Sequence, residues 1–242
     1  MFTITSFGES HGRCVGVTID GCPAGLPLDE ADIQREVDRR RPGQTPGATR
    51  RAEDDKVEIL SGVFNGRTTG APLSMLVRNK DTDSSQYEKI RMTPRPGHAD
   101  YTAYVKYGGF NDFRGGGRFS GRITVGFVMA GAVARKLLGY IGIGILAHTI
   151  EIGGIKAENR ALSEIRRNVE ISPLKCGDPA AALEMMRAIE TAQAEGDSVG
   201  GIIEGLALNV PAGLGEPVFD TMEGELAKAI FAIPSVKGVE FG

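Results

Sequence analysis

The stretch "VEILSGVFNGRTTGAPLSMLV", residues 57–77, contains two apolar, partly β-branched runs separated by a segment rich in glycine and threonine. This pattern predicts a hairpin-like pair of strands, 57–60 and 73–77. A doubly wound parallel sheet would need a helix between two such strands. The stretch therefore favours an α+β protein.

Working outward from this stretch, we predict three more strands and four helices. The strands are the β-branched runs 15–19, 141–150 and 201–210. The helices, identified by apolar spacing and terminal signals, are 29–40, 120–139, 178–196 and 220–230. For the last helix we expect Asp220 to pair with Glu223 in a capping box, and the buried residues to be Met222, Leu226 and Ile230. No tandem repeat or linker divides the chain, so we expect one domain over residues 1–242.

The composition is that of a soluble globular protein of 242 residues, 41% hydrophobic and 24% charged. A net charge of −3 gives the whole molecule no electrostatic attraction to nucleic acid or a membrane surface, so any anion binding must be local. No run of 18 apolar residues predicts a membrane span. Three cysteines, Cys14, Cys22 and Cys176, fit reduced thiols in a cytosolic protein.

Two of the three histidines lie in glycine-containing turns. His11 is in "FGESHGR" (7–13) and His98 in "RPGHAD" (95–100), at the end of the polar segment 78–100. Each could be an ordinary loop histidine, with His98 paired to Asp100. Glycine also lets the backbone approach a ligand, which favours a functional role for the pair. His148, in the apolar "ILAHTI", is more typical of a structural strand residue.

The segment "FRGGGRFSGR" (113–122) combines three consecutive glycines, a helix start at Ser120 and three arginines. Backbone N–H groups, the positive helix end and guanidinium groups together are typical of an anion site. The alternative is a flexible basic loop. The spacing matches neither a dinucleotide fingerprint nor a P-loop.

A second basic segment, "REVDRRRPGQTPGATRR" (35–51), contains Arg39, Arg40 and Arg41 in a row. Arginines at a helix end complement the helix dipole, but three exceed what capping requires. In an acidic protein they indicate a polyanionic substrate, because arginine binds carboxylate and phosphate with two hydrogen bonds. No spacing indicates a metal site or a Ser-His-acid arrangement. The residues thus predict an enzyme acting on a small, multiply anionic molecule, and leave its reaction open.

Nine motifs resemble those of chorismate synthase, in order and with nearly the same spacing. They are "FGESHGR", "GCPAGLPL", "DRRRPGQ", "ILSGVFNGRTTGAPLSMLVRNKD", "RPGHADYTAYVKYGG", "FRGGGRFSGR", "GDSVGGIIEG", "VPAGLGEPVFD" and "SVKGVEFG". The resemblance covers essentially all 242 residues, and several motifs are specific to the family.

The resemblance implies a carbon–oxygen lyase that eliminates phosphate from 5-enolpyruvylshikimate 3-phosphate to give chorismate. This is the last step of the shikimate pathway, which serves aromatic amino-acid biosynthesis. Family members use reduced FMN although the reaction has no net redox change, and in some members NADPH reduces the flavin. The resemblance also implies a β-α-β sandwich, a homotetramer and a cytoplasmic location, with no nucleic-acid or membrane partner.

The family's site residues carry over position by position. The implied catalytic residues are His11, near the flavin, and His98, a proton donor near the substrate. The implied substrate contacts are Ser10, Arg40, Arg41 and Arg122. The implied FMN contacts are Arg118, Phe119, Ser120, Pro234 and Ser235. No metal is implied.

The sequence also departs from the family. Members are usually longer, and a later glycine-rich segment, a flavin loop and an aspartate-containing motif have no counterpart in the 242 residues. We therefore expect a truncated chain, incomplete at the C-terminus, that binds FMN weakly by itself. Ile123 and Phe127 stand where the family commonly has glutamate and arginine. The alternative function is a catalytically inactive remnant that only binds ligands or other subunits.

Overall fold

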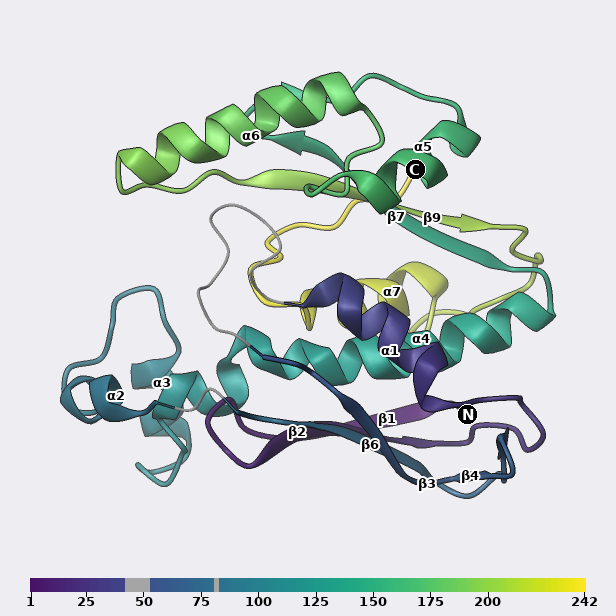
Figure 1. Cartoon of the computed structure of the whole chain (residues 1–242), viewed down its shortest axis with the longest axis horizontal. Helices are drawn as coiled ribbons and strands as arrows, with labels where there is room; N and C mark the ends of the chain where they lie inside the picture. Colours follow the sequence, from purple (N-terminus) through teal and green to yellow (C-terminus); the bar gives the residue numbers. More distant parts are fainter. Residues whose placement is uncertain (42–52, 81–82) are drawn as a thin grey trace. The chain divides into compact units, whose positions relative to one another are not determined.

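The computed structural model describes residues 1–41, 53–80 and 83–242 (Figure 1). The chain forms two compact units. The first contains Met1–Arg40, Glu53–Ala134 and Pro211–Gly242, and the second contains Arg135–Val210 together with Arg41. The part of the arginine-rich segment from 42 to 51 lies outside the described residues. The expectation of one domain over 1–242 stays a prediction.

The first unit contains a four-stranded antiparallel sheet in the order β1-β2-β6-β3. Its strands are β1 (Thr3–Gly8), β2 (Cys14–Asp20), β6 (Leu73–Arg78) and β3 (Val57–Ser61). Side chains alternate between the two faces of a strand, and the register therefore collects six fully buried residues on one face. These are Val15, Val17, Ile19, Leu73, Met75 and Val77.

The hairpin-like pair predicted over 57–77 is confirmed, because β3 and β6 are neighbours in this sheet. Between them, β4 (Val63–Phe64) and β5 (Arg67–Thr68) form a small hairpin of their own. Its turn is Asn65-Gly66, and both residues have positive φ, as the tight turns of hairpins require. No strand had been predicted between residues 60 and 73.

Two helices pack on the apolar face of the sheet, α1 (Glu30–Arg40) and α4 (Thr124–Tyr140) (Figure 1). Gly126 allows the close approach of α4, since a Cβ there would lie 3.1 Å from the carbonyl oxygen of Gly16 on β2. Both predicted helices are confirmed, although 120–139 begins with a short 3-10 turn, η2 (Gly121–Ile123). Gly121–Tyr140 is long and apolar enough to cross a bilayer, a test that core helices also pass.

Four more helical segments belong to the first unit. They are α2 (Ser85–Ile90), α3 (Asp100–Lys106), the 3-10 segment η1 (Arg114–Phe119) and α7 (Met222–Phe231). The expected cap of α7 at Asp220 is wrong, because the hydroxyl of Thr221 accepts the backbone N–H of Gly224 instead. The expected burial is also wrong, since α7 has no buried residue and Leu226 is exposed.

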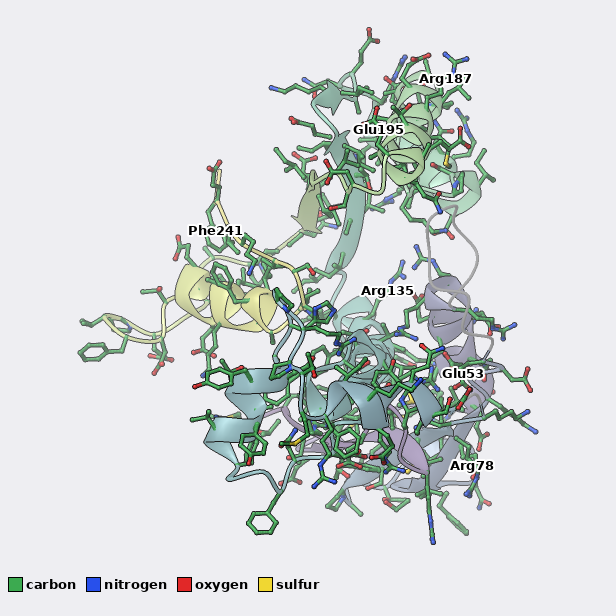
Figure 2. The ribbon with its side chains drawn as sticks, turned by 90° about the vertical axis from the view of Figure 1, so that its left-hand side faces the viewer. Glu53, Arg78, Arg135, Arg187, Glu195 and Phe241 are labelled. Carbon is green, nitrogen blue, oxygen red and sulfur yellow. The ribbon has the colours of Figure 1, made fainter. Side chains whose placement is uncertain are left out.

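The second unit contains a three-stranded antiparallel sheet, β8-β7-β9, with two helices. The elements are β7 (Gly144–Ile152), β8 (Ile155–Lys156), α5 (Leu162–Ile171), α6 (Pro179–Ala194) and β9 (Gly201–Leu208). As expected, Asp178 caps α6 and Pro179 is its first residue; Arg187 lies on this helix (Figure 2). Strand β7 begins at Gly144, later than predicted, because residues 141 and 142 form a turn that closes the end of α4. The helix α5 was not predicted.

The α+β class is confirmed, since the antiparallel sheets and the helices occur without βαβ alternation. All three cysteines are free, in agreement with the reading as thiols. Burial raises the pKa of the Cys22 and Cys176 thiols, which favours the unreactive, protonated form.

Candidate functional site

The motif "FGESHGR" is the loop of the β1–β2 hairpin. Strand β1 ends at Gly8, whose φ of 85° and closeness to the carbonyl oxygen of Cys14 leave no room for a Cβ. The backbone N–H of Gly12 donates to the carbonyl oxygen of Glu9 at 3.1 Å. Ser10 and His11 are therefore the two central residues of a β-turn.

The three glycines of η1 lie against this turn. Gly115, Gly116 and Gly117 have φ of 58°, 80° and 52°, values that side-chain-bearing residues rarely adopt. The backbone N–H of Ser10 donates to the carbonyl oxygen of Gly117 at 3.3 Å. A Cβ at Gly115 would lie 1.9 Å from Nδ1 of His11, so only glycine lets the loop come this close.

Two arginines of the glycine-rich segment have partners within the protein. Arg114 forms two 2.8 Å contacts with the carboxylate of Asp112, and this hydrogen bonding lowers the pKa of Asp112. Arg118 donates to the carbonyl oxygens of Gly8 and Ser6, and to the Ser6 hydroxyl, at 2.7 to 3.1 Å. Arg118, an implied flavin contact, thus holds the end of β1 next to the His11 turn.

The third arginine, Arg122, belongs to a buried charge cluster. Its side chain is 3% exposed and contacts Asp55 at 2.5 Å and Glu53 at 4.0 Å, two carboxylates with no exposed surface. Arg40 contacts the same Asp55 at 3.4 Å and donates to the carbonyl oxygen of Gly121 at 3.2 Å. Buried carboxylates require such cationic partners. No sequence pattern had indicated Glu53, labelled in Figure 2, or Asp55.

A cavity of about 300 Å³ opens beside the glycine loop. Three of the implied site residues, His98, Phe119 and Ser120, line it together with Gly115 and Gly116. The remaining lining includes aromatic and cationic side chains from α2, α3 and the segments that follow them: Tyr87, Arg91, Arg95, Tyr104 and Phe113. The cavity thus combines flat apolar surfaces, which suit a ligand with a ring, with charges of both signs, since Asp100 and Asp112 also line it.

His98 lies exposed at this cavity, with Nδ1 at 3.1 Å from the carbonyl oxygen of Pro96. The main partner of Asp100 is Arg95 rather than His98, because Arg95 holds the carboxylate with two side-chain hydrogen bonds of 2.8 and 3.0 Å, to which His98 adds only a weaker charge interaction. These bonds lower the pKa of Asp100. The "RPGHAD" turn is therefore closed by Arg95 and Asp100, and His98 is presented at its edge.

Tyr87 links the His11 turn to the cavity. Its ring meets the imidazole of His11 edge to face, with centroids 5.1 Å apart, and it also lines the cavity. The guanidinium of Arg95 lies 5.8 Å from the centre of the same ring. The sequence had assigned Tyr87 no role, because the functional interpretation of the polar segment 78–100 rested on the histidine turn at its end.

The remaining implied residues lie outside this arrangement. Pro234 and Ser235 are exposed and do not belong to the cavity lining. Arg41 is half-buried and belongs to the second unit. His148 is buried on β7 with Nε2 at 2.8 Å from the carboxylate of Glu204, which confirms it as a strand residue. In the described part of the chain, no three His, Cys, Asp or Glu side chains converge as metal ligands would.

Comparisons with known proteins agree with these motifs. The family profile described as chorismate synthase matches residues 2–242. Proteins named chorismate synthase from Dehalococcoides mccartyi and Korarchaeum cryptofilum are 60% and 61% identical to 100% and 99% of the chain, which spans 66% of each. A crystal structure titled "Crystal Structure of Chorismate Synthase" matches with a TM-score of 0.81 and 32% identity, over 99% of this chain and 68% of that one.

Proposed function

The chain belongs to the chorismate synthase family, and on this premise we propose that its protein converts 5-enolpyruvylshikimate 3-phosphate to chorismate and phosphate with reduced FMN. The reaction breaks one carbon–oxygen bond to phosphate and one carbon–hydrogen bond of the ring, so the enzyme is a carbon–oxygen lyase. It would supply the last step of the shikimate pathway.

One observation carries the proposal: the two histidine turns meet around the glycine loop. Gly115 contacts His11 and lines the cavity, and His98 lines the same cavity. An elimination needs a proton donor for the leaving phosphate, and an exposed imidazole can hold a proton near neutral pH. We assign that role to His98, and to His11 the role of supporting the reduced flavin.

For the substrate anion, we propose contacts by Ser10, Arg40, Arg41 and Arg122. Ser10 is supported by its place beside His11 in the turn. Arg40 and Arg122 both contact Asp55, so part of their charge is neutralised within the protein. The Arg91 side chain at the cavity is a further cation for the phosphate and carboxylates, whereas Arg95 is paired with Asp100.

The cavity fits a flavin in its chemistry. Phe119 and Ser120, two of the implied FMN contacts, line it, and Tyr104 and Phe113 add flat apolar surface on which an aromatic ring can pack. Arg118 is engaged with β1 and would act by holding the loop in place. We propose Pro234 and Ser235 as additional contacts on the resemblance alone. When bound, reduced FMN supplies a transient electron that the elimination returns to it.

Further properties of the family are proposed for the protein as a whole. They are a homotetrameric assembly, a cytoplasmic location, a small phosphorylated substrate as the main partner, and NADPH as a source of electrons for the flavin. They rest on family membership.

An anaerobic assay of phosphate release from 5-enolpyruvylshikimate 3-phosphate tests the proposed function on the full-length protein. We expect equal amounts of phosphate and chorismate with reduced FMN, and no turnover with oxidised FMN, because the flavin must be able to give an electron. Phosphate release that is independent of the flavin would contradict the assignment of the cofactor. Absence of release with reduced FMN would contradict the reaction.

A further inference from the structure

Asn79 holds the turn that carries Ser10 and His11. It follows β6 directly, and its Nδ2 donates to the carbonyl oxygens of Glu9 at 3.0 Å and Gly12 at 2.8 Å. These are the two ends of the β-turn. Its backbone N–H donates to the carbonyl oxygen of Arg13 at 3.1 Å. One residue from another strand thus fixes both ends of the turn and the residue that follows it.

Arg122 determines which way the Asn79 amide faces. Its Nε donates to Oδ1 of Asn79 at 3.0 Å. A guanidinium can only donate a hydrogen bond and a carbonyl oxygen can only accept one. The Asn79 amide therefore satisfies Arg122 and the two carbonyl oxygens in only one orientation. Arg122 is in turn held by Asp55 in the buried charge cluster. The amide is therefore anchored to the interior of the unit.

The turn is confined from the opposite side by the glycine loop. The carbonyl oxygen of Gly117 accepts the N–H of Ser10, and Gly115 allows the backbone to touch the imidazole of His11. With Asn79 fixing the turn ends and the glycines fixing its centre, the direction of His11 depends on both. Catalytic side chains need such support, since small displacements reduce rates strongly.

We propose that Asn79 is a positioning residue. Its amide group, oriented by Arg122, holds both ends of the turn that carries His11 and thereby fixes the direction of the imidazole. For its catalytic consequence the inference rests on the proposed function. The clamp itself is a property of the fold and can be tested without turnover.

The first test is Asn79→Asp. The exchange keeps the size and the Arg122 contact but replaces the Nδ2 donor with an oxygen that faces two carbonyl oxygens. The imidazole ¹H–¹⁵N signals of the protein's three histidines can be assigned by replacing each in turn. We expect the His11 signals to shift or broaden while those of His148 stay in place. Asn65→Asp, the same exchange at the exposed β4–β5 turn, should move none of them.

Asn79→Ala removes the clamp without adding charge, and covers the case in which Asn79→Asp does not fold. It should disturb the His11 signals as well. Unchanged His11 signals in a folded Asn79 variant would overturn the proposal, whatever reaction the protein catalyses.

Turnover provides a second, independent test through a double-mutant cycle. We expect Asn79→Asp to lower kcat about 100-fold, with a smaller change in KM, because His11 is misplaced. In a His11→Ala background the same exchange should lower kcat less than about threefold, because its effect passes through His11. Equal effects in both backgrounds would overturn the positioning role. If the unsubstituted protein and all its variants were inactive, the proposed function would be refuted. The His11 imidazole signals would still test whether Asn79 holds the turn.

Discussion

The arginines of the glycine-rich segment show what the sequence can and cannot predict about single residues. The sequence predicted that the three glycines form part of an anion site, which stays a prediction; the structure shows that Gly115 comes close to His11. The sequence could not show that Arg118 and Arg122 have partners inside the protein, because those partners, on β1 and at Asp55, are far apart from them in the chain. The partner of Arg114, Asp112, is only two residues away and could have been recognised from the sequence.

The turn at His98 is likewise held by a pair that the sequence had assigned differently. Asp100 is bound by Arg95, which leaves His98 exposed at the cavity. Both charged residues lie within the quoted motif, so their proximity was predictable. The choice of Arg95 over His98 depends on the turn geometry, which positions the guanidinium and the backbone N–H of residue 95 toward the same carboxylate.

We predict that Asp100→Asn lowers the free energy of unfolding by about 1 kcal/mol at pH 7, allowing for partial exposure of the pair. Because Arg95 lowers the pKa of Asp100 in the folded state, the stabilisation is fully present at a pH above the unfolded-state pKa of about 3.9. The stabilisation is lost as the pH falls through the lower folded-state pKa of Asp100. Urea unfolding of both proteins from pH 7 to pH 2.5 measures this. A stability difference that does not shrink in acid would contradict the assignment.

At the scale of elements, the sequence predicted those helices and strands that have strong local signals. The caps and apolar spacing of α1 and α6, and the β-branched runs of β2, β3 and β6, predicted these elements. Strand β1 was not predicted, although the β-branched residues Thr3, Ile4 and Thr5 of "TITSFG" favour a strand, and it pairs along the whole of its length with β2. Without β1, the His11 motif could not be recognised as a hairpin loop.

Helix α7 illustrates the opposite failure. Its apolar spacing predicted burial, yet it has no buried residue. Spacing shows which side chains share a helix face, and it does not show whether that face is covered. The same holds for its start, where Asp220 and Thr221 both have capping side chains and only the backbone geometry selects Thr221.

We predict that Thr221→Ala costs α7 about 1 kcal/mol, the usual value of an N-cap. The amide of Gly224, which donates to the Thr221 hydroxyl, should then exchange with solvent about fivefold faster. Asp220→Ala is the matched control and should leave exchange in α7 nearly unchanged. Equal acceleration by both variants would show that the cap is shared or lies at Asp220.

At the scale of the whole molecule, the proposed site is built from segments that are far apart in the sequence and belong to the first unit. The turn before α3 and the glycine loop line one cavity, and the β1–β2 loop, held by the residue after β6, contacts the glycine loop. The relatives named chorismate synthase share this whole stretch and continue over a further third of their length. Of the residues that the resemblance implied, His98, Phe119 and Ser120 line the cavity, whereas Tyr87 and Asn79 and the contacts they make required the structure.

The central claim is that His11 and His98, and not His148, act in the reaction. The most direct measurement is anaerobic phosphate release with reduced FMN after each histidine of the full-length protein is replaced singly, as His11→Ala, His98→Ala and His148→Gln. We predict losses of about 100-fold or more for the first two, the scale of general acid–base catalysis, and less than about threefold for the third. Unchanged turnover in either His11→Ala or His98→Ala would contradict the account.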